Sequence, residues 1–410
     1  MLVKYLTKLF SKRLYLKLII FGLFIQIISL FRRYPLDHPC GRVLDINSFM
    51  SVLINCDSAV YMKDAQNPIR LVNGESVYQD RPIPTLLVAM LAKFWHFLNL
   101  PDYYREVQGN SGQIVTYSLV TYIIFLALSA AIFSMACYVG LKSLFRFQQK
   151  LTIPAEVFIS TSFIFVIVVA MNEITKTFFW TPGSQMFNLL LPVYAFYLIT
   201  YNYKDITYKF YFSQILIVSM LMFSYAFFII LLVPLILAKW NKLRNRLLLC
   251  SVPIIAYLSY PFLLNQFGGT YNNFAVGYRR MYIWVIDAYK QDKFFEKISE
   301  FLGYFFESIP LLPTILILIA LTAFILMQKN LHLDFRNELL LIFVHILMIS
   351  FYGYYSRRLT FPIIVLLLLV IIKLFFTLKS GAQKRILQLG LPVLVPIVIG
   401  SWIFTLGPLV

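Results

Sequence analysis

The chain has 410 residues, of which 60% are hydrophobic and only 13% are charged, and its mean hydropathy is +0.77. A soluble domain is about 45–50% apolar and about 25% charged, so this composition excludes a water-soluble globular protein and indicates one that a bilayer surrounds. The net charge of +18 fits either nucleic-acid binding or the positive-inside bias of membrane proteins, and the positions of the charges decide between them.

The first apolar run, 14–31, follows four basic residues and precedes no small-residue cleavage site. We expect it to form a retained first helix with its N-terminus on the cytoplasmic side. Further apolar runs occupy 114–141, 154–171, 186–201, 211–238, 247–264, 308–327, 338–352, 359–377 and 386–406. Most are long enough to cross about 30 Å of hydrocarbon at about 1.5 Å per residue.

Two apolar runs need a separate interpretation. The run 83–99 contains a lysine and a histidine and follows a Pro-rich sequence, so we predict an interfacial helix rather than a crossing. The run 211–238 is predicted to form two short helices that turn near Ser224 and Tyr225, which keeps the basic residues after it inside. The expected fold is an all-α polytopic membrane protein, with about eleven transmembrane helices in one domain that covers the whole chain.

This topology separates the charges by side. The predicted inner segments are 1–13, 142–150, 202–210, 239–246, 328–337 and 378–385, and they hold 18 Lys and Arg residues and only two acids, Asp205 and Asp334. The far longer outer segments hold 16 basic and 14 acidic residues. The bias accounts for most of the net charge and leaves no reason to expect nucleic acid as a partner. The large outer loops, 32–113 and 265–307, are the places to look for chemistry.

No P-loop, dinucleotide-binding glycine motif, zinc-protease motif or metal-binding Cys/His spacing occurs in the sequence. An ATP-driven pump is therefore not indicated, no cofactor is assigned, and the use of a divalent cation stays open. Cys40 and Cys56 share the first outer loop and pair only if that side is oxidising and the two residues lie close together, which sequence does not determine.

The first outer loop carries an acidic helical pattern. Helical spacing places Asp57, Tyr61 and Ala65 on one face, and Arg81 then opens the Pro-rich stretch that leads into the interfacial helix. A carboxylate can take a proton as a general base, and it can equally cap a helix, so both roles of Asp57 stay open. The loop holds three reserve acids, Asp45, Asp64 and Asp80.

This pattern resembles the GT-C class of glycosyltransferases, such as the protein O-mannosyltransferases and the bacterial lipid-A aminoarabinose transferases. In those families an aspartate in the first outer loop serves the reaction, and Asp57 is the matching position. Those families often carry paired acids, whereas Ser58 follows here. The resemblance implies an inverting transfer of a sugar from a polyprenyl phosphate to a lipid, glycan or protein acceptor, at the outer face of a bacterial cytoplasmic membrane.

Glu173 is the second acidic candidate, because it follows an apolar run at the predicted outer boundary. A salt bridge to Lys176 at helical spacing is the alternative. Tyr271, in the second large outer loop, is a candidate for stacking on an acceptor sugar.

Two arginine pairs lie on the predicted outer side against the positive-inside bias: Arg279 and Arg280, and Arg357 and Arg358, the latter in a predicted short loop, 353–358, between two helices. Arginine forks bind phosphate oxygens, so both pairs are candidates for holding the leaving phosphate. Anchoring to anionic lipid headgroups is the alternative for each pair.

Two other functions remain alternatives. A polysaccharide polymerase or O-antigen ligase also has many helices and outer-side arginines, but its large outer loop usually lies late in the chain. A lipid or polysaccharide flippase, or another secondary transporter, usually shows inverted repeats and charges buried in mid-span, and the sequence shows no such repeat.

Overall fold

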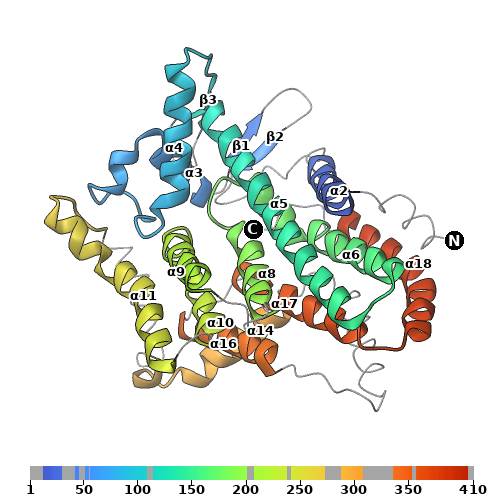
Figure 1. Ribbon diagram of the computed structural model, residues 1–410. Helices are drawn as coiled ribbons and strands as arrows, with labels where there is room; N and C mark the ends of the chain where they lie inside the picture. Colours follow the sequence, from blue (N-terminus) through green and yellow to red (C-terminus); the bar gives the residue numbers. More distant parts are fainter. Residues whose placement is uncertain are drawn as a thin grey trace.

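The computed structural model describes residues 13–29, 42–45, 51–54, 56–108, 114–200, 207–237, 242–272, 288–307, 336–352 and 357–404. Most of these residues are helical, which confirms the helical class (Figure 1). The α-helices are α2 (Leu14–Ile28), α3 (Cys56–Gln66), α4 (Pro82–Phe97), α5 (Leu119–Leu151), α6 (Ala155–Ala170), α7 (Glu173–Trp180), α8 (Phe187–Thr200), α9 (Tyr208–Met222), α10 (Leu232–Leu237), α11 (Leu243–Gln266), α14 (Phe294–Glu307), α16 (Arg336–Tyr352), α17 (Arg357–Phe375) and α18 (Ser380–Phe404). Two 3-10 helices are η1 (Pro68–Leu71) and η3 (Ala226–Leu231), and the strands are β1 (Arg42–Asp45), β2 (Ser51–Ile54), β3 (Tyr104–Gln108) and β4 (Ile114–Ser118).

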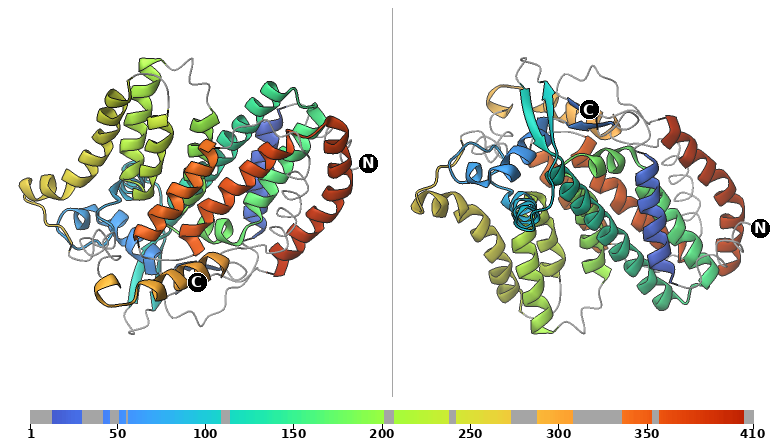
Figure 2. Two further views of the ribbon diagram at one scale, coloured as in Figure 1. Left: turned by 90° about the horizontal axis from the view of Figure 1, so that it is seen from below. Right: turned by 90° about the horizontal axis from the view of Figure 1, so that it is seen from above.

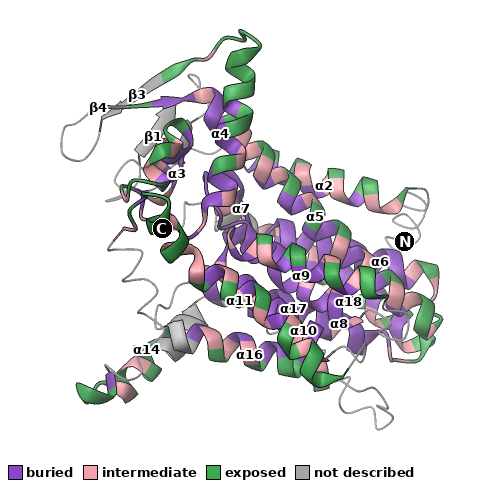
Figure 3. Ribbon diagram, turned by 60° about the vertical axis from the view of Figure 1, so that its left-hand side comes forward, coloured by how far each residue is buried: buried purple, intermediate pink, exposed green. Residues whose placement is uncertain are grey.

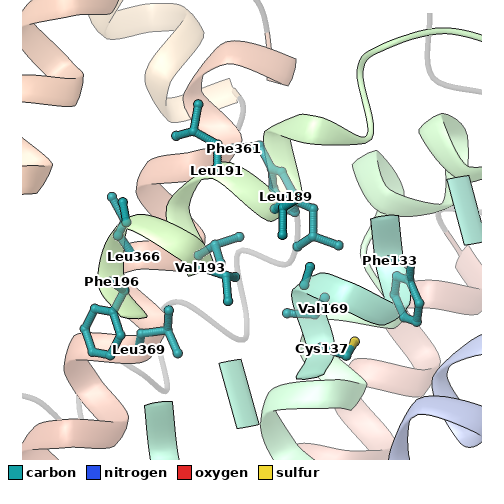
Figure 4. Packing of buried hydrophobic residues seen from close by; sticks show 14 of the residues in the cluster. Phe133, Cys137, Val169, Leu189, Leu191, Val193, Phe196, Phe361, Leu366 and Leu369 are labelled. Atoms are coloured by element: carbon teal, nitrogen blue, oxygen red, sulfur yellow. The ribbon is translucent and has the colours of Figure 1, made fainter. Parts of the chain in front are cut away.

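Helix α8 packs against both α5 and α17 and forms the centre of the bundle (Figure 1). Nearly every residue of α8 is buried, although Pro192 interrupts its backbone hydrogen bonding. Figure 4 shows side chains of α5, α6, α8 and α17 gathered there, Phe196 and Leu369 among them. Gly140 of α5 permits this close packing, because a Cβ atom at that position would lie 2.5 Å from the ring of Phe165.

Within the described residues, three helices are long and apolar enough to cross a membrane: α5, α11, and α18 over Ser380–Gly400. The pair of α6 and α7, bent by 63° at the break between them, is a fourth candidate. Helices α2, α8, α9 and α16 have 14 to 17 residues, fewer than the about 20 that a lipid-surrounded crossing needs. The structure therefore supports association with a membrane, and the number of about eleven crossings stays a prediction.

The predicted division of 211–238 into two short helices is confirmed. Helix α9 ends at Met222, and η3 begins at Ala226 and continues into α10. Within the break, the backbone carbonyl of Phe223 accepts a 3.4 Å hydrogen bond from the amide of Ile83 at the start of α4. The break is therefore also a point where the predicted first outer loop contacts the bundle.

Two expectations are corrected. The stretch 142–150, predicted as a basic inner loop, forms the last turns of the 33-residue α5. Arg357 and Arg358, predicted in a short loop, begin α17. Lys and Arg are good helix formers, so the helix continues through them and α5 stops only where Thr152 adopts a left-handed conformation, with φ 52°. The predicted span 308–327 lies outside the described residues.

The predicted first outer loop contains the antiparallel β-hairpin β1–β2 and strand β3, and β3 pairs with β4 at the start of the predicted apolar run 114–141, neither of which the sequence predicted. The hairpins, α3 and α4 lie together at one end of the helical bundle (Figure 2, Figure 3). Strand β4 runs directly into α5, where Ser118 caps the helix by accepting a 3.1 Å hydrogen bond from the amide of Thr121. The Ser118 hydroxyl in turn donates to Asp102 at 2.7 Å, which ties the loop to α5.

Candidate functional site

Asp57 lies in the first turn of α3, and its carboxylate binds side chains from two other segments. The Tyr78 hydroxyl donates to Oδ1 at 2.5 Å, and the Gln185 amide donates to Oδ2 at 3.2 Å. Gln185 lies 128 residues further along the chain, in the turn between α7 and α8. Asp57 as a whole is half-buried. A helix cap alone does not explain why these distant donors converge on it.

The rings of Tyr61 and Tyr78 stack in parallel beside this carboxylate, with centroids 4.5 Å apart and an interplanar angle of 4°. Tyr61 lies one turn after Asp57 on α3, as the helical spacing predicted, and its hydroxyl shares a 2.7 Å hydrogen bond with Ser184. Burial raises the pKa of Tyr61 to about 12. Burial and then the charge of Asp57 raise the pKa of Tyr78 even further. Both phenols therefore remain neutral hydrogen-bonding groups near pH 7.

The turn between α7 and α8 delivers Ser184 and Gln185 to α3. Its position is fixed from the side of α5, where the Tyr122 hydroxyl donates a 2.9 Å hydrogen bond to the carbonyl oxygen of Trp180. Gly183 leaves room for the Gln185 side chain, because a Cβ atom on Gly183 would lie 2.2 Å from Oε1 of Gln185. The turn thus needs glycine at this position to hold the amide that binds Asp57.

Arg81 lies beside the same cluster and is surrounded by aromatic rings. Its guanidinium carbon is 5.7 Å from the ring centroid of Tyr78 and 5.1 Å from that of Tyr225, just before η3. Its Nε is 3.7 Å from Oδ2 of Asp80, which accepts a 3.2 Å hydrogen bond from the Tyr257 hydroxyl of α11. The arginine side chain is 15% exposed, so a positive charge is held at the surface of the cluster by cation–π contacts.

Residues 270–272, at the start of the predicted second outer loop, dock onto the predicted first outer loop through backbone and amide groups. The side chain of Gln79 donates to the carbonyl of Thr270 at 2.9 Å and accepts from the amide of Asn272 at 2.6 Å. Asn73 and Thr270 also form a parallel β-bridge. Tyr271 lies between these two anchored residues, so the structure brings it beside the segment that contains Asn73 and Gln79.

The reserve acid Asp64 has a structural role. Its fully buried side chain accepts a hydrogen bond from Ser76 and a 2.9 Å hydrogen bond from Nε of Arg70. Burial raises the pKa of Asp64 despite these two partners. This network fastens the segment that ends at Tyr78 against α3, and so helps to place the donor to Asp57. Among the other reserve acids, Asp80 belongs to the Arg81 cluster.

The remaining candidates are only partly located. Glu173 is the first residue of α7, directly after the capping residue Asn172, and its side chain lies outside the described atoms. Its salt bridge to Lys176, a buried residue, therefore stays a prediction. The side chains of Arg357 and Arg358 are likewise not described, and the pair Arg279 and Arg280 lies outside the described residues, as does Cys40.

A series of contacts connects the start of α17 with the Arg81 cluster. The carbonyl oxygen of Leu359, two residues after Arg357, lies 3.3 Å from Nε2 of His345 on α16. The His345 ring is 6.2 Å from Phe227, and the Phe227 ring is 5.7 Å from Tyr225, which contacts Arg81. The first turn of α17, which contains Arg357 and Arg358, therefore lies toward the end of the bundle that carries Asp57.

The sequence analysis missed five residues of this site: Tyr78, Ser184, Gln185, Tyr225 and Tyr257. The first four share one signal, a polar or phenolic side chain at a break between apolar helices or in the segment before α4, whereas Tyr257 lies within α11 and shows no such signal. Among the described residues, no group of three or more His, Cys, Asp or Glu side chains could hold a metal ion. The site is a charged carboxylate held by neutral donors beside an aromatic-bound cation, which suits a ligand with a hydroxyl group and a negative charge. No protein-family model, curated protein or solved structure matches the chain.

Proposed function

We propose that this chain is a GT-C-like membrane glycosyltransferase that moves a sugar from a polyprenyl phosphate to a lipid, glycan or protein acceptor. The observation that carries the proposal is the meeting of Asp57 and Arg81 around Tyr78 at one end of a helical bundle. A transferase of this kind needs a base for the acceptor hydroxyl and a cation for the departing phosphate, and the cluster offers both.

In the proposed reaction, the acceptor hydroxyl attacks the anomeric carbon of the donor sugar from the face opposite the phosphate. A new glycosidic bond forms, the bond from the anomeric carbon to the phosphate oxygen breaks, and the configuration inverts. The carboxylate of Asp57 takes the hydroxyl proton, and the phosphate leaves with the bonding electron pair. Arg81 stabilises the phosphate charge, and Arg357 and Arg358, together with the N-terminus of α17, supply further positive charge.

The proposed topology has about eleven crossings, a cytoplasmic N-terminus and the site on the outer side of a bacterial cytoplasmic membrane. The distribution of charge supports this orientation. The described basic residues at the far end of α5, 142–150, belong to a predicted inner side that holds only two acids. Short and broken helices such as α8, α9 and η3 suit a bundle that encloses a cavity rather than one that faces lipid throughout.

The test is turnover of polyprenyl-phosphate sugars by the purified full-length chain, with Asp57→Asn beside the natural protein. We expect the rate to fall about 10²–10⁴-fold, because a general base contributes that much. The matched control is Glu106→Gln, which neutralises an exposed acid of the same loop and should leave the rate unchanged. A folded Asp57→Asn variant with full activity would remove Asp57 as the base.

One observation favours a second candidate, a lipid or polysaccharide flippase. Helices α6 and α7 form one bent pair, and α9 breaks before η3, and broken helices are typical of secondary transporters. Proteoliposomes separate the two functions. A flippase moves a labelled polyprenyl-phosphate sugar between leaflets without cleaving it, whereas a transferase releases polyprenyl phosphate in proportion to product.

A further inference from the structure

A basic cluster lies near the C-terminal end of α5, whereas Tyr122 lies near the N-terminal end. The proposed reaction does not use this cluster. Lys142 and Arg146, one helical turn apart, both contact the ring of Tyr197 on α8. The Lys142 Nζ atom is 5.8 Å from the ring centroid, and the Arg146 Cζ atom is 4.3 Å from it. Arg146 also donates a 2.9 Å hydrogen bond to the Tyr197 hydroxyl. The two cations therefore contact the same ring and are no more than about 10 Å apart.

The cluster is held by other side chains and is not a pair of freely moving surface chains. Tyr194 stacks on Tyr197 with centroids 6.2 Å apart, and its hydroxyl donates to Gln214 of α9. Lys142 also lies 5.7 Å from the ring of Tyr138. Side chains from α5, α8 and α9 therefore hold the tyrosine rings in place, and these rings contact Lys142 and Arg146. Within the described residues, no carboxylate lies within ion-pair distance of Lys142.

The position of the cluster is set by the geometry of α5. Tyr122, near the start of α5, is bonded to the turn that carries Gln185, whereas Lys142 and Arg146 come 20 and 24 residues later. At about 1.5 Å per residue this separation is about 30–36 Å, close to the thickness of the hydrocarbon core. Measured along α5, the cluster is therefore about as far from the turn that carries Gln185 as one face of the hydrocarbon core is from the other.

We propose that Lys142, Arg146 and Tyr197 form a binding site for the phosphate headgroup of an anionic phospholipid in the inner leaflet. Lys142 and Arg146 lie one helical turn apart and carry like charges, so a phosphate that contacts both is attracted by both. The Arg146 fork binds phosphate oxygens, Lys142 adds a point charge, and the Tyr197 ring holds both at the level of the headgroups. The proposal is independent of the catalytic role of Asp57.

The experiment is native mass spectrometry of the full-length chain in detergent, with phosphatidylglycerol and phosphatidylcholine offered separately. We expect phosphatidylglycerol to bind more tightly, and the double variant Lys142→Gln/Arg146→Gln to lose about 30-fold in affinity, since each cation contributes about 1 kcal/mol. The control is Lys150→Gln/Lys209→Gln, which removes the same charge from α5 and α9 outside the Tyr197 cluster and should lose much less. Melting temperatures confirm that every variant is folded.

A second pair of variants tests the geometry if the double variant does not fold. Tyr197→Phe keeps the ring but removes the hydroxyl that Arg146 binds, and Arg146→Lys keeps the charge but removes the fork. Both should weaken phosphatidylglycerol binding several-fold. Equal losses in the cluster and control variants would reduce the effect to general surface charge and overturn the site. Binding of inorganic phosphate alone with the same affinity would overturn a lipid as its ligand.

Discussion

The hydroxyl group of Tyr78 donates a 2.5 Å hydrogen bond to Asp57, which lies 21 residues earlier in the chain. Because burial and the neighbouring carboxylate both raise the pKa of Tyr78, the phenol keeps its proton and the carboxylate keeps a neutral donor. The stacked ring of Tyr61 and the Asp64 network hold Tyr78 in this position. The carboxylate of Asp57 is therefore held by a residue that the sequence pattern did not single out.

Tyr78→Phe should make the Asp57 carboxylate easier to protonate, because the charged form loses a strong donor while the ring stack is kept. The acidic limb of the activity profile should therefore move to higher pH, by about one unit or more, since a hydrogen bond to a charged group contributes about 1.5–3 kcal/mol. The measurement is the sugar-transfer rate between pH 4 and 9. If the acidic limb and the melting temperature were both unchanged, the Tyr78 hydroxyl would have no effect on the protonation of Asp57.

Tyr61→Phe should make the free energy of unfolding less dependent on pH in the alkaline range. The pKa of Tyr61 is raised to about 12 in the folded chain, whereas an unfolded tyrosine titrates near 10. The stabilising effect of the buried neutral phenol is complete below about pH 10 and is lost as the pH rises toward about 12, because the unfolded chain then holds fewer protons. Unfolding of the natural chain should therefore depend more steeply on pH in this window, by up to about 1.4 kcal/mol per pH unit.

The measurement for Tyr61 is unfolding in detergent at several values between pH 9 and pH 12, followed by circular dichroism. The exposed Tyr103→Phe variant is the matched control, because it removes a phenol without removing a buried hydrogen bond. If the Tyr61 and Tyr103 variants showed the same slope, the buried phenol would not be the group that titrates.

Gly183→Ala should reproduce the loss of Gln185 without changing that residue. The new Cβ atom would overlap Oε1 of Gln185, so the side chain must move and its hydrogen bond to Asp57 breaks. We expect transfer rates to fall about equally in Gly183→Ala and Gln185→Ala, with little additional loss in the double variant. Gly381→Ala is a control, because its Cβ atom would meet no neighbour. Additive losses would show that Gly183 acts by another route.

The helical class and several boundaries could be predicted from the sequence, because apolar runs, prolines and caps are local signals. The break between α9 and η3 and the start of α4 at Pro82 follow from such signals. The pairing of Asp57 with Gln185 could not be predicted, because it depends on how the turn between α7 and α8 packs on α3. The β-hairpins were also missed. Their residues were interpreted as loop or as part of an apolar run, and the pairing of two short strands has no local signal.

The ion pair between Glu338 and Lys373 was also missed, because each residue alone looks like the ordinary end of an apolar run. The two side chains are 4% and 8% exposed, and they join α16 to α17, with the ammonium group 5.5 Å from the ring of Phe147. A buried ion pair is tolerated in the folded chain only while both side chains are present. Removal of either one leaves a buried charge without a partner.

Glu338→Gln and Lys373→Met should each destabilise the folded chain strongly, by about 3–5 kcal/mol, whereas Glu338→Leu combined with Lys373→Met should recover most of this loss. The measurement is thermal unfolding of each variant in the same detergent. Glu156→Gln is the matched control, because Glu156 and Lys384 form a 3.6 Å pair with both side chains nearly half exposed, and an exposed pair contributes at most about 1 kcal/mol. If Glu338→Gln and Glu156→Gln lowered the midpoint equally, the buried pair would contribute no more than an exposed one, and α16 and α17 would be held together by their apolar contacts alone.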